Sequence, residues 1–331
     1  MGKRELKQIQ PFDDIFYRHC YYNPLLTALR YYGKDVTPFI VNDVNVYKIK
    51  KKNESKCNVQ FYSRYVGVKK DDEILSELGI EVKNHLYTTD IITTIIQSIN
   101  EDIPLIIYAD AYYCKHYELF YKNSHHKHFM LVFGYDEELN IFKIVDVNNE
   151  HISVKNIKFE TLKTAYEGYY KFLQMKSDDV NYSQVILKEN CSNKLNHNYI
   201  SVFRSNMLKN KELMLNNTEV LKHINSNLNE ILAEESGIDK NINELLESFF
   251  FIIVIKKTEK YRIQKLFGDE FFLVDPLDKI IKEWEKIKIK IIKYNSIRNI
   301  KVKTMFNHIN KIYVLESYYN KELFNYIEKI K

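Results

Sequence analysis

The spacing of apolar residues changes partway along the chain. Before about residue 178, helical patterns alternate with short apolar runs that are typical of strands, at 104–108, 128–135 and 141–147. After residue 199, apolar residues recur every three or four positions, at about 200–232, 239–258, 276–297 and 300–330. The change predicts an α+β N-terminal domain followed by an all-α C-terminal domain. Gly237 is expected to end the first helix of the second domain.

A polar segment separates the two patterns. Residues 181–198 are mostly polar, with asparagines and serines clustered around Cys191, which is typical of a linker or an extended arm. With 331 residues, of which 45% are hydrophobic, the chain can form two hydrophobic cores. We therefore expect one domain at 1–178, a linker or arm at 179–198 and a helical domain at 199–331.

The charge of the chain is small and unevenly distributed. A net charge of +5 does not indicate nucleic-acid binding, and none is expected. In the segment 278–331, however, 13 basic residues outnumber 6 acidic ones. Two interpretations of this segment stay open: a solvated lysine-rich helix face, or a surface that docks an acidic partner.

The cysteines and the apolar runs indicate a cytoplasmic protein. Cys20, Cys57, Cys114 and Cys191 lie far apart without a C-x-x-C pair, so neither a disulfide framework nor a zinc ribbon is expected. The first residues lack the apolar stretch of an export signal. The longest apolar run, 249–255, is too short to span a bilayer, so no membrane contact is expected.

Cys20 precedes a segment with a helical pattern. Positions 25, 28, 29 and 32 fall on one helical face, Pro24 is compatible with a first turn, and Gly33 suits a C-cap. Cys20 would then lie at or just before a helix N-terminus, where backbone N–H groups and the helix dipole stabilise a thiolate. The alternative is a buried, inert cysteine. His19 is expected to be structural.

A hairpin places a histidine near an aspartate. The apolar runs 128–135 and 141–147 flank a polar stretch, and a turn centred near Glu137 puts residue 128 opposite residue 146. Cross-strand partners share a face, so His128 and Asp146 would be neighbours. A cysteine at a helix N-terminus, an imidazole and an orienting carboxylate form a Cys-His-Asp triad.

Several motifs occur in an order that is similar to a known family. They are the His19-Cys20 pair opening a helix that ends at Gly33, the stretch Asp110-Ala111-Tyr112-Tyr113, and the segment from His125 to Gly134-Tyr135-Asp136. Over about residues 15–175, the chain resembles the butirosin biosynthesis protein H N-terminal family. That family is similar in fold to papain-like cysteine peptidases, including those that cut bacteriocin leaders. The resemblance implies a papain-like domain in which the cysteine-bearing helix packs on an antiparallel sheet.

The resemblance also implies a reaction. The family's founding member is an acyltransferase, which moves an acyl group from the phosphopantetheine thioester of an acyl carrier protein to an amine. Carried over, Cys20 is the nucleophile, His128 the general base and acid, and Asp146 the residue that orients His128. One difference is Val147, because the family usually has proline after the aspartate. Amidotransferases of thioamide antibiotic assembly are a further similar group, which these motifs do not separate.

The implied partners are an acyl carrier protein and a small amine acceptor, in specialised-metabolite, antibiotic-like biosynthesis. No bound cofactor is expected, because the carrier brings the phosphopantetheine. The sequence contains no glycine-rich phosphate loop, so nucleotide-dependent chemistry is not expected. The lysine-rich segment 278–331 would help to dock the carrier.

Further side chains are candidates for the substrate site. The backbone N–H of Cys20 is the first expected donor to the oxyanion, and Asn23 and Gln10 are candidates for the second. Asp110, Tyr112 and Tyr113 follow a strand and open an aromatic loop containing Tyr117, Phe120 and Tyr121. This loop either forms a substrate wall or lid, or its tyrosines cap the core and Asp110 begins a turn.

Other interpretations remain open. His125, His126 and His128 have a spacing that invites a metal site, but no matched metal motif accompanies them and no metal is expected. The enzyme alternative is a cysteine peptidase or amide hydrolase, in which water replaces the amine. The non-enzyme alternative is a binding or self-resistance protein on the same scaffold.

Overall fold

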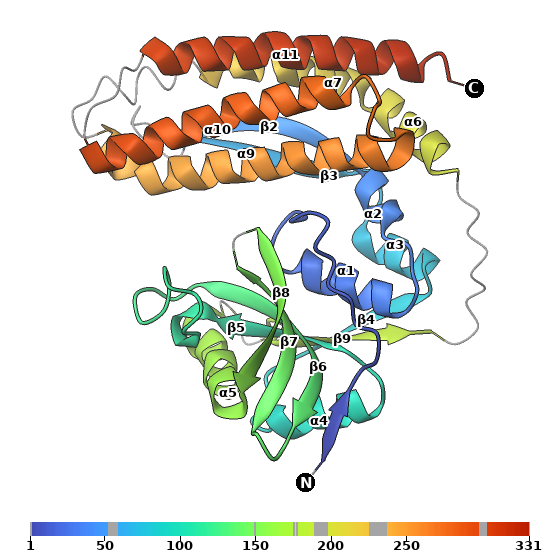
Figure 1. The fold of residues 1–331 in the computed structure, drawn as a ribbon, viewed down its shortest axis with the longest axis vertical. Coiled ribbons are helices and arrows are strands. Elements are labelled where there is room, and N and C mark those ends of the chain that lie inside the picture. The colour runs from blue at the N-terminus through green and yellow to red at the C-terminus, as the bar shows by residue number, and fades with distance from the viewer. Residues whose placement is uncertain are drawn as a thin grey trace. The chain divides into compact units, whose positions relative to one another are not determined.

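The computed structural model divides into two compact units (Figure 1). The first comprises Met1–Val36 and Lys70–Asn196, and the second comprises Thr37–Lys69 and His197–Lys331. The structure describes residues 2–51, 59–148, 150–174, 176, 178–188, 198–224, 237–297 and 303–330.

An antiparallel sheet of seven strands forms the framework of the first unit (Figure 1). Its order is β4-β9-β5-β6-β7-β8, and β1 pairs with β6. The runs expected as strands are confirmed as β5, β6 and β7. The bounds are β1 (Lys3–Glu5), β4 (Ile80–His85), β5 (Leu105–Asp110), β6 (Lys127–Asp136), β7 (Ile141–Asn148), β8 (His151–Lys158) and β9 (Tyr182–Leu187).

The β6–β7 hairpin forms, but its register differs from the expected one. A bulge between Val132 and Gly134 shifts the pairing. On the side of the bulge away from the turn, Leu131 pairs with Val145. Continuing this register places Asp146 opposite residue 130, not opposite His128. Because side chains alternate with a period of two, this shift of two residues keeps His128 and Asp146 on the same face, as diagonal neighbours.

Helix α1 (Tyr22–Tyr31) forms as its sequence predicts and packs on β6 and β7. Pro24 is accommodated in the first turn. At the other end Gly33 has a φ of +67°, and the backbone N–H of Lys34 donates to the carbonyl of Leu29 at 2.9 Å. This is a Schellman C-cap, in which glycine adopts the left-handed conformation without steric cost.

The other helices of the first unit surround the sheet. α4 contacts β1 and β6, and α5 contacts β5 and β8. Short turns follow two of the elements, η1 after β5 and the π-helix η2 after α5. The bounds are α3 (Asp71–Glu77), α4 (Ile91–Asn100), η1 (Ala111–Tyr113), α5 (Phe159–Gly168) and η2 (Tyr169–Leu173).

The second unit is mainly helical but includes a β-hairpin. Strands β2 and β3 pair with each other, and β3 packs along α9. The core contains the side chain of Trp284, which is fully buried. Among the helices that the structure describes, none is long and apolar enough to cross a membrane. The bounds are α2 (Thr37–Asn42), β2 (Asp43–Lys51), β3 (Val59–Gly67), α6 (Tyr199–Lys209), α7 (Lys211–Thr218), α9 (Gly237–Phe267), α10 (Val274–Ile297) and α11 (Lys303–Ile327).

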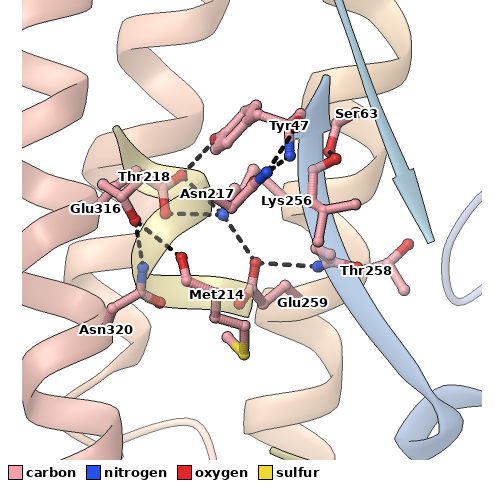
Figure 2. A network of polar contacts seen from close by, with 12 residues as sticks. Tyr47, Ser63, Met214, Asn217, Thr218, Lys256, Thr258, Glu259, Glu316 and Asn320 are labelled. Atoms are coloured by element: carbon pink, nitrogen blue, oxygen red, sulfur yellow. Dashed lines mark hydrogen bonds and ion pairs between the residues drawn. The ribbon is translucent and has the colours of Figure 1, made fainter. Parts of the chain in front are cut away.

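A buried network of charged side chains crosses the core of the second unit (Figure 2). Lys256 Nζ lies 3.0 Å from Glu259 Oε2 and 2.7 Å from Glu316 Oε1. The Tyr47 hydroxyl donates to Glu316, and Asn45 Nδ2 donates to Glu259 at 3.0 Å. Since buried charges are tolerated only when they are paired, these contacts fix β2 against α9 and α11.

The division of the chain differs from the expected one in three places. Residues 37–69, expected in the N-terminal domain, lie in the second unit because their hairpin buries apolar side chains in its core, so that unit is not all-α. The expected linker 179–198 contains β9, which pairs with β4 and β5, and its residues 189–197 lie outside the described part of the chain. Gly237 begins α9, although it was expected to end a helix.

Candidate active site

Cys20 lies two residues before α1, whose N-cap residue is Tyr21. Within this fully described helix, no side chain caps the N-terminus and no acidic residue occupies the first turn. The positive end of the helix dipole is therefore available to stabilise a negative charge on the thiol. The expected position of Cys20 just before a helix is confirmed.

A cluster of polar side chains holds the turn that carries Cys20. Arg18 Nη1 donates to both carboxylate oxygens of Asp71, at 3.0 and 2.9 Å, and to the Tyr22 hydroxyl at 2.7 Å. The Tyr22 hydroxyl in turn donates to Asp71 at 2.5 Å. The sequence does not predict this role for Asp71, because a run of consecutive acidic residues, here 71–73, is typical of a solvated surface.

Asn23, a candidate for substrate binding and for the oxyanion, is occupied elsewhere. Its side-chain oxygen accepts the backbone N–H of Tyr17 at 3.0 Å, and its Nδ2 donates to the carbonyls of Phe12 and Ile15 at 2.9 and 2.7 Å. The residue is fully buried. Asn23 therefore anchors the segment before Cys20 and has no donor left for a substrate.

His128 is buried at the start of β6, where it meets the two other predicted triad residues. Its Nε2 lies 2.9 Å from Asp146 Oδ1. Its imidazole also interacts with the thiol of Cys20, and this interaction shifts the pKa values of both groups. Nε2 contacts the carboxylate, which leaves Nδ1 as the ring nitrogen without a carboxylate partner. The structure thus brings Cys20, His128 and Asp146 into one chain of contacts.

Asp146 is fully buried on β7 and surrounded by donors. Its Oδ2 lies 2.7 Å from His116 Nε2 and 3.1 Å from Lys155 Nζ. Its Oδ1 accepts the backbone N–H of Val147 at 2.9 Å. These groups stabilise the carboxylate form, and a fixed carboxylate orients the imidazole beside it.

Tyr117 completes the surroundings of the imidazole. Its buried hydroxyl contacts both His128 Nε2 and Asp146 Oδ1, and its ring centroid lies 4.4 Å from that of His128. The segment is fixed to β7 because Asn148 Nδ2 donates to the carbonyl of His116 at 3.1 Å. Sequence reasoning placed Tyr117 only in a loop that walls the substrate or caps the core, and no spacing pattern singles out its hydroxyl.

The pKa values of the cysteine and the histidine move in opposite directions. Burial alone would raise the pKa of Cys20, but hydrogen bonds from His128 and His19 lower it from 9.0 to about 6. Burial alone would lower the pKa of His128, but hydrogen bonds with Asp146 and Cys20 raise it from 6.5 to about 9. Between these values the pair is a thiolate and an imidazolium, which is the reactive form of a catalytic cysteine.

The shifted pKa of Asp146 agrees with this pairing. Burial opposes ionisation of Asp146, yet contacts with His116 and His128 hold its pKa well below the ordinary value. The contact of His19 with the thiol gives this residue a role beyond the structural one expected for it. Cys114 behaves in the opposite way to Cys20, since burial raises the pKa of its thiol and keeps it neutral.

Asp110 is a buried anchor at the end of β5. Its carboxylate accepts the backbone N–H groups of Tyr112 and His126, both at 3.1 Å, and lies 2.5 Å from His125 Nδ1. The carboxylate thereby ties the loop after β5 to the residues before β6. These contacts are the turn-forming role that was the alternative to substrate binding for Asp110.

Tyr112 and Tyr113 line the same loop. Tyr112 stacks on His125 with a centroid distance of 4.6 Å. Tyr113 packs so closely on Gly168 that a Cβ there would lie 2.2 Å from its ring. Within the described residues, neither tyrosine hydrogen-bonds to Cys20, His128 or Asp146, and the side chain of Gln10 is exposed.

The three imidazoles at 125–128 have different partners. His125 contacts Asp110, His126 stacks on Phe120 at 4.1 Å, and His128 contacts Asp146. In the described part of the chain, no three potential metal ligands form a group able to hold an ion. The other two cysteines of the chain, Cys57 and Cys191, lie outside the described residues.

No family model matches the chain, and no curated protein matches it either. The function therefore has to be inferred from the chemistry of the site.

Proposed function

We propose that the protein is a cysteine-dependent acyltransferase that forms an amide by moving an acyl group from a carrier-protein thioester to an amine. The observation that carries this proposal is the contact chain Cys20–His128–Asp146, with a cysteine pKa of about 6 and a histidine pKa of about 9. The resemblance of residues 15–175 to the butirosin biosynthesis protein H N-terminal family supplies the substrate class and its setting in specialised-metabolite assembly.

A papain-like arrangement of the first unit is part of the proposal. The cysteine precedes a helix that packs on an antiparallel sheet, and the sheet carries the histidine and the aspartate on adjacent strands. Both features are what such a fold requires of its catalytic residues.

The first half of the reaction is a thioester exchange. The Cys20 thiolate attacks the carbonyl carbon of the carrier thioester, and a tetrahedral intermediate forms. The S–C bond to the phosphopantetheine breaks, His128 gives its proton to the leaving thiolate, and the acyl group remains on Cys20. The backbone N–H of Cys20 is the proposed first donor to the oxyanion.

The second half transfers the acyl group to the amine. His128, now neutral, takes a proton from the amine as its nitrogen attacks the acyl-cysteine. The C–S bond breaks, the amide leaves, and the thiolate–imidazolium pair is restored. Asp146 holds the ring so that Nδ1 stays directed at the sulfur, and its charge stabilises the imidazolium in both halves.

Product analysis tests the proposal. Acylated carrier protein is incubated with an amine and with wild type, Cys20→Ala or Cys114→Ala, and amide and free acid are quantified by mass spectrometry. Wild type and the matched control Cys114→Ala should form amide, and Cys20→Ala should not. Free acid formed at the same rate with and without amine would instead identify a hydrolase.

A further inference from the structure

Lys127 lies on three aromatic rings at the start of β6. Its Nζ is 5.0 Å from the ring centroid of Tyr108, 5.1 Å from that of Phe129 and 5.2 Å from that of Tyr169. The rings belong to β5, β6 and η2, so three segments of the first unit converge on one ammonium group. Cation–π contacts of this kind restrain a lysine that would otherwise sample many rotamers.

This cluster adjoins the nucleophile. Tyr21, the residue after Cys20, packs edge-on against Phe129 with a centroid distance of 5.3 Å, and its ring centroid lies 6.3 Å from that of Tyr108. Burial lowers the pKa of Lys127, and the charges of Asp179 and of the Cys20 thiolate oppose this lowering. The aromatic cluster that holds the Lys127 ammonium therefore adjoins the residue that follows Cys20.

The ammonium has no acidic partner in close contact. Among the described residues no ion pair of Lys127 with a carboxylate is found, although the charge of Asp179 acts on its pKa. The side chain is exposed. A restrained and exposed cation without an ion pair is a binding group for an anion, and it disfavours a second cation at the same place.

Resting on the acyl transfer proposed above, we propose that Lys127 binds a carboxylate of the substrate that reacts at Cys20. The phosphate of a phosphopantetheine arm is separated from its thioester by the whole pantetheine chain, so an anion beside the sulfur belongs to the acyl group or to the amine acceptor. A dicarboxylic half-thioester and an amino acid acceptor are the two sources of such a carboxylate.

Two experiments distinguish the sources. In the first, pantetheine thioesters of succinate and butyrate are compared by the rate at which Cys20 gains the acyl mass. In the second, the butyryl enzyme is discharged by an amino acid or by its amide. In one of the two experiments, wild type should react roughly tenfold faster with the carboxylate-bearing compound than with the neutral one. This ratio corresponds to the lower end of what a charge-assisted hydrogen bond contributes.

Variants at Lys127 decide the proposal. Lys127→Met should remove the preference and Lys127→Glu should invert it, while rates with the neutral compounds stay within about threefold of wild type. Lys122→Met is the matched control, because Lys122 is also exposed and lies 5.4 Å from the single ring of Tyr121. A preference that survives in Lys127→Met, or no carboxylate preference in either experiment, would overturn this assignment. If wild type does not react with the neutral compounds at all, the acyl transfer itself would be refuted.

Discussion

The reactivity of Cys20 toward an alkylating reagent should depend most strongly on its two imidazole partners at acidic pH. With both present the pKa of Cys20 is about 6, so about 9% of the thiol is ionised at pH 5. In the double variant His19→Ala/His128→Ala only burial acts on the thiol, and its pKa returns to 9.0 or above. The ionised fraction at pH 5 is then at most about 0.01%.

The difference in rate is smaller than the difference in ionisation. A thiolate of lower pKa is a weaker nucleophile, and a Brønsted coefficient of about 0.45 makes the native thiolate roughly 20-fold less reactive per ion. The roughly 900-fold difference in ionised fraction at pH 5 therefore becomes a rate difference of about 40-fold. At pH 7 the same calculation gives only about fourfold.

The assay is timed alkylation with iodoacetamide, followed by peptide mass spectrometry that quantifies the modification of Cys20. Cys114 in the same samples should remain unmodified while the protein is folded, because its thiol is buried and neutral. His126→Ala is the matched control, since that imidazole stacks on Phe120. Wild-type and double-variant rates within threefold of each other at pH 5 would refute the activation of Cys20.

Four further outcomes are expected. The rate of Cys20 acylation should rise through about pH 6 and fall above about pH 9, because the thiolate and the imidazolium are both required; a flat profile would contradict this pairing. Tyr117→Phe should lower kcat/KM about tenfold, because one hydrogen bond to a charged partner is lost, and steady-state kinetics showing less than a twofold change would exclude that role. Lys256→Met should lower the free energy of unfolding by about 3–5 kcal/mol, measured by fluorescence of the single, buried Trp284, since Glu316 loses its cation and Glu259 keeps only the longer contact with Arg262. Three exposed lysines share one face of α10: Lys282, Lys286 and Lys293. Neutralising them should raise KM for the acylated carrier but leave kcat and KM for a pantetheine thioester unchanged. An unchanged KM for the carrier would rule out docking at this face.

Local signals predicted the helix after Cys20 and the hairpin after His128. Pro24 and Gly33 mark the ends of α1 because their backbone preferences act within one turn, without help from the rest of the chain. The predicted contact between His128 and Asp146 is present although the predicted register was wrong, because the two registers differ by an even number of residues. A bulge cannot be located from apolar spacing alone, and a shift of one residue would have separated the two side chains.

Long-range pairing accounts for what the sequence did not predict. The strand at 182–187 has no strong pattern of its own, and it forms because β4 and β5 supply partners about 80 to 100 residues away in the chain. Residues 37–69 join the helices for the same reason, through side chains such as Tyr47 that meet Glu316.

The contacts around the triad are equally nonlocal. His116 and Lys155 reach Asp146 from separate segments, and Arg18 reaches Asp71 across 53 positions. No motif encodes such contacts, so the contact of His128 with Asp146 was predictable from sequence but the side chains that surround it were not. His19 is the exception, because its position beside Cys20 made a contact with the thiol foreseeable.

Intact-protein mass spectrometry of the acyl-enzyme tests the central claim most directly. Wild type and Cys20→Ala are incubated with acylated carrier protein, separated from it and weighed before and after addition of an amine. The account predicts one acyl adduct on wild type, none on Cys20→Ala, and loss of the adduct as an amide when the amine is added. No adduct on wild type, or an adduct that persists in Cys20→Ala, would contradict the claim that Cys20 is the acyl-transferring nucleophile.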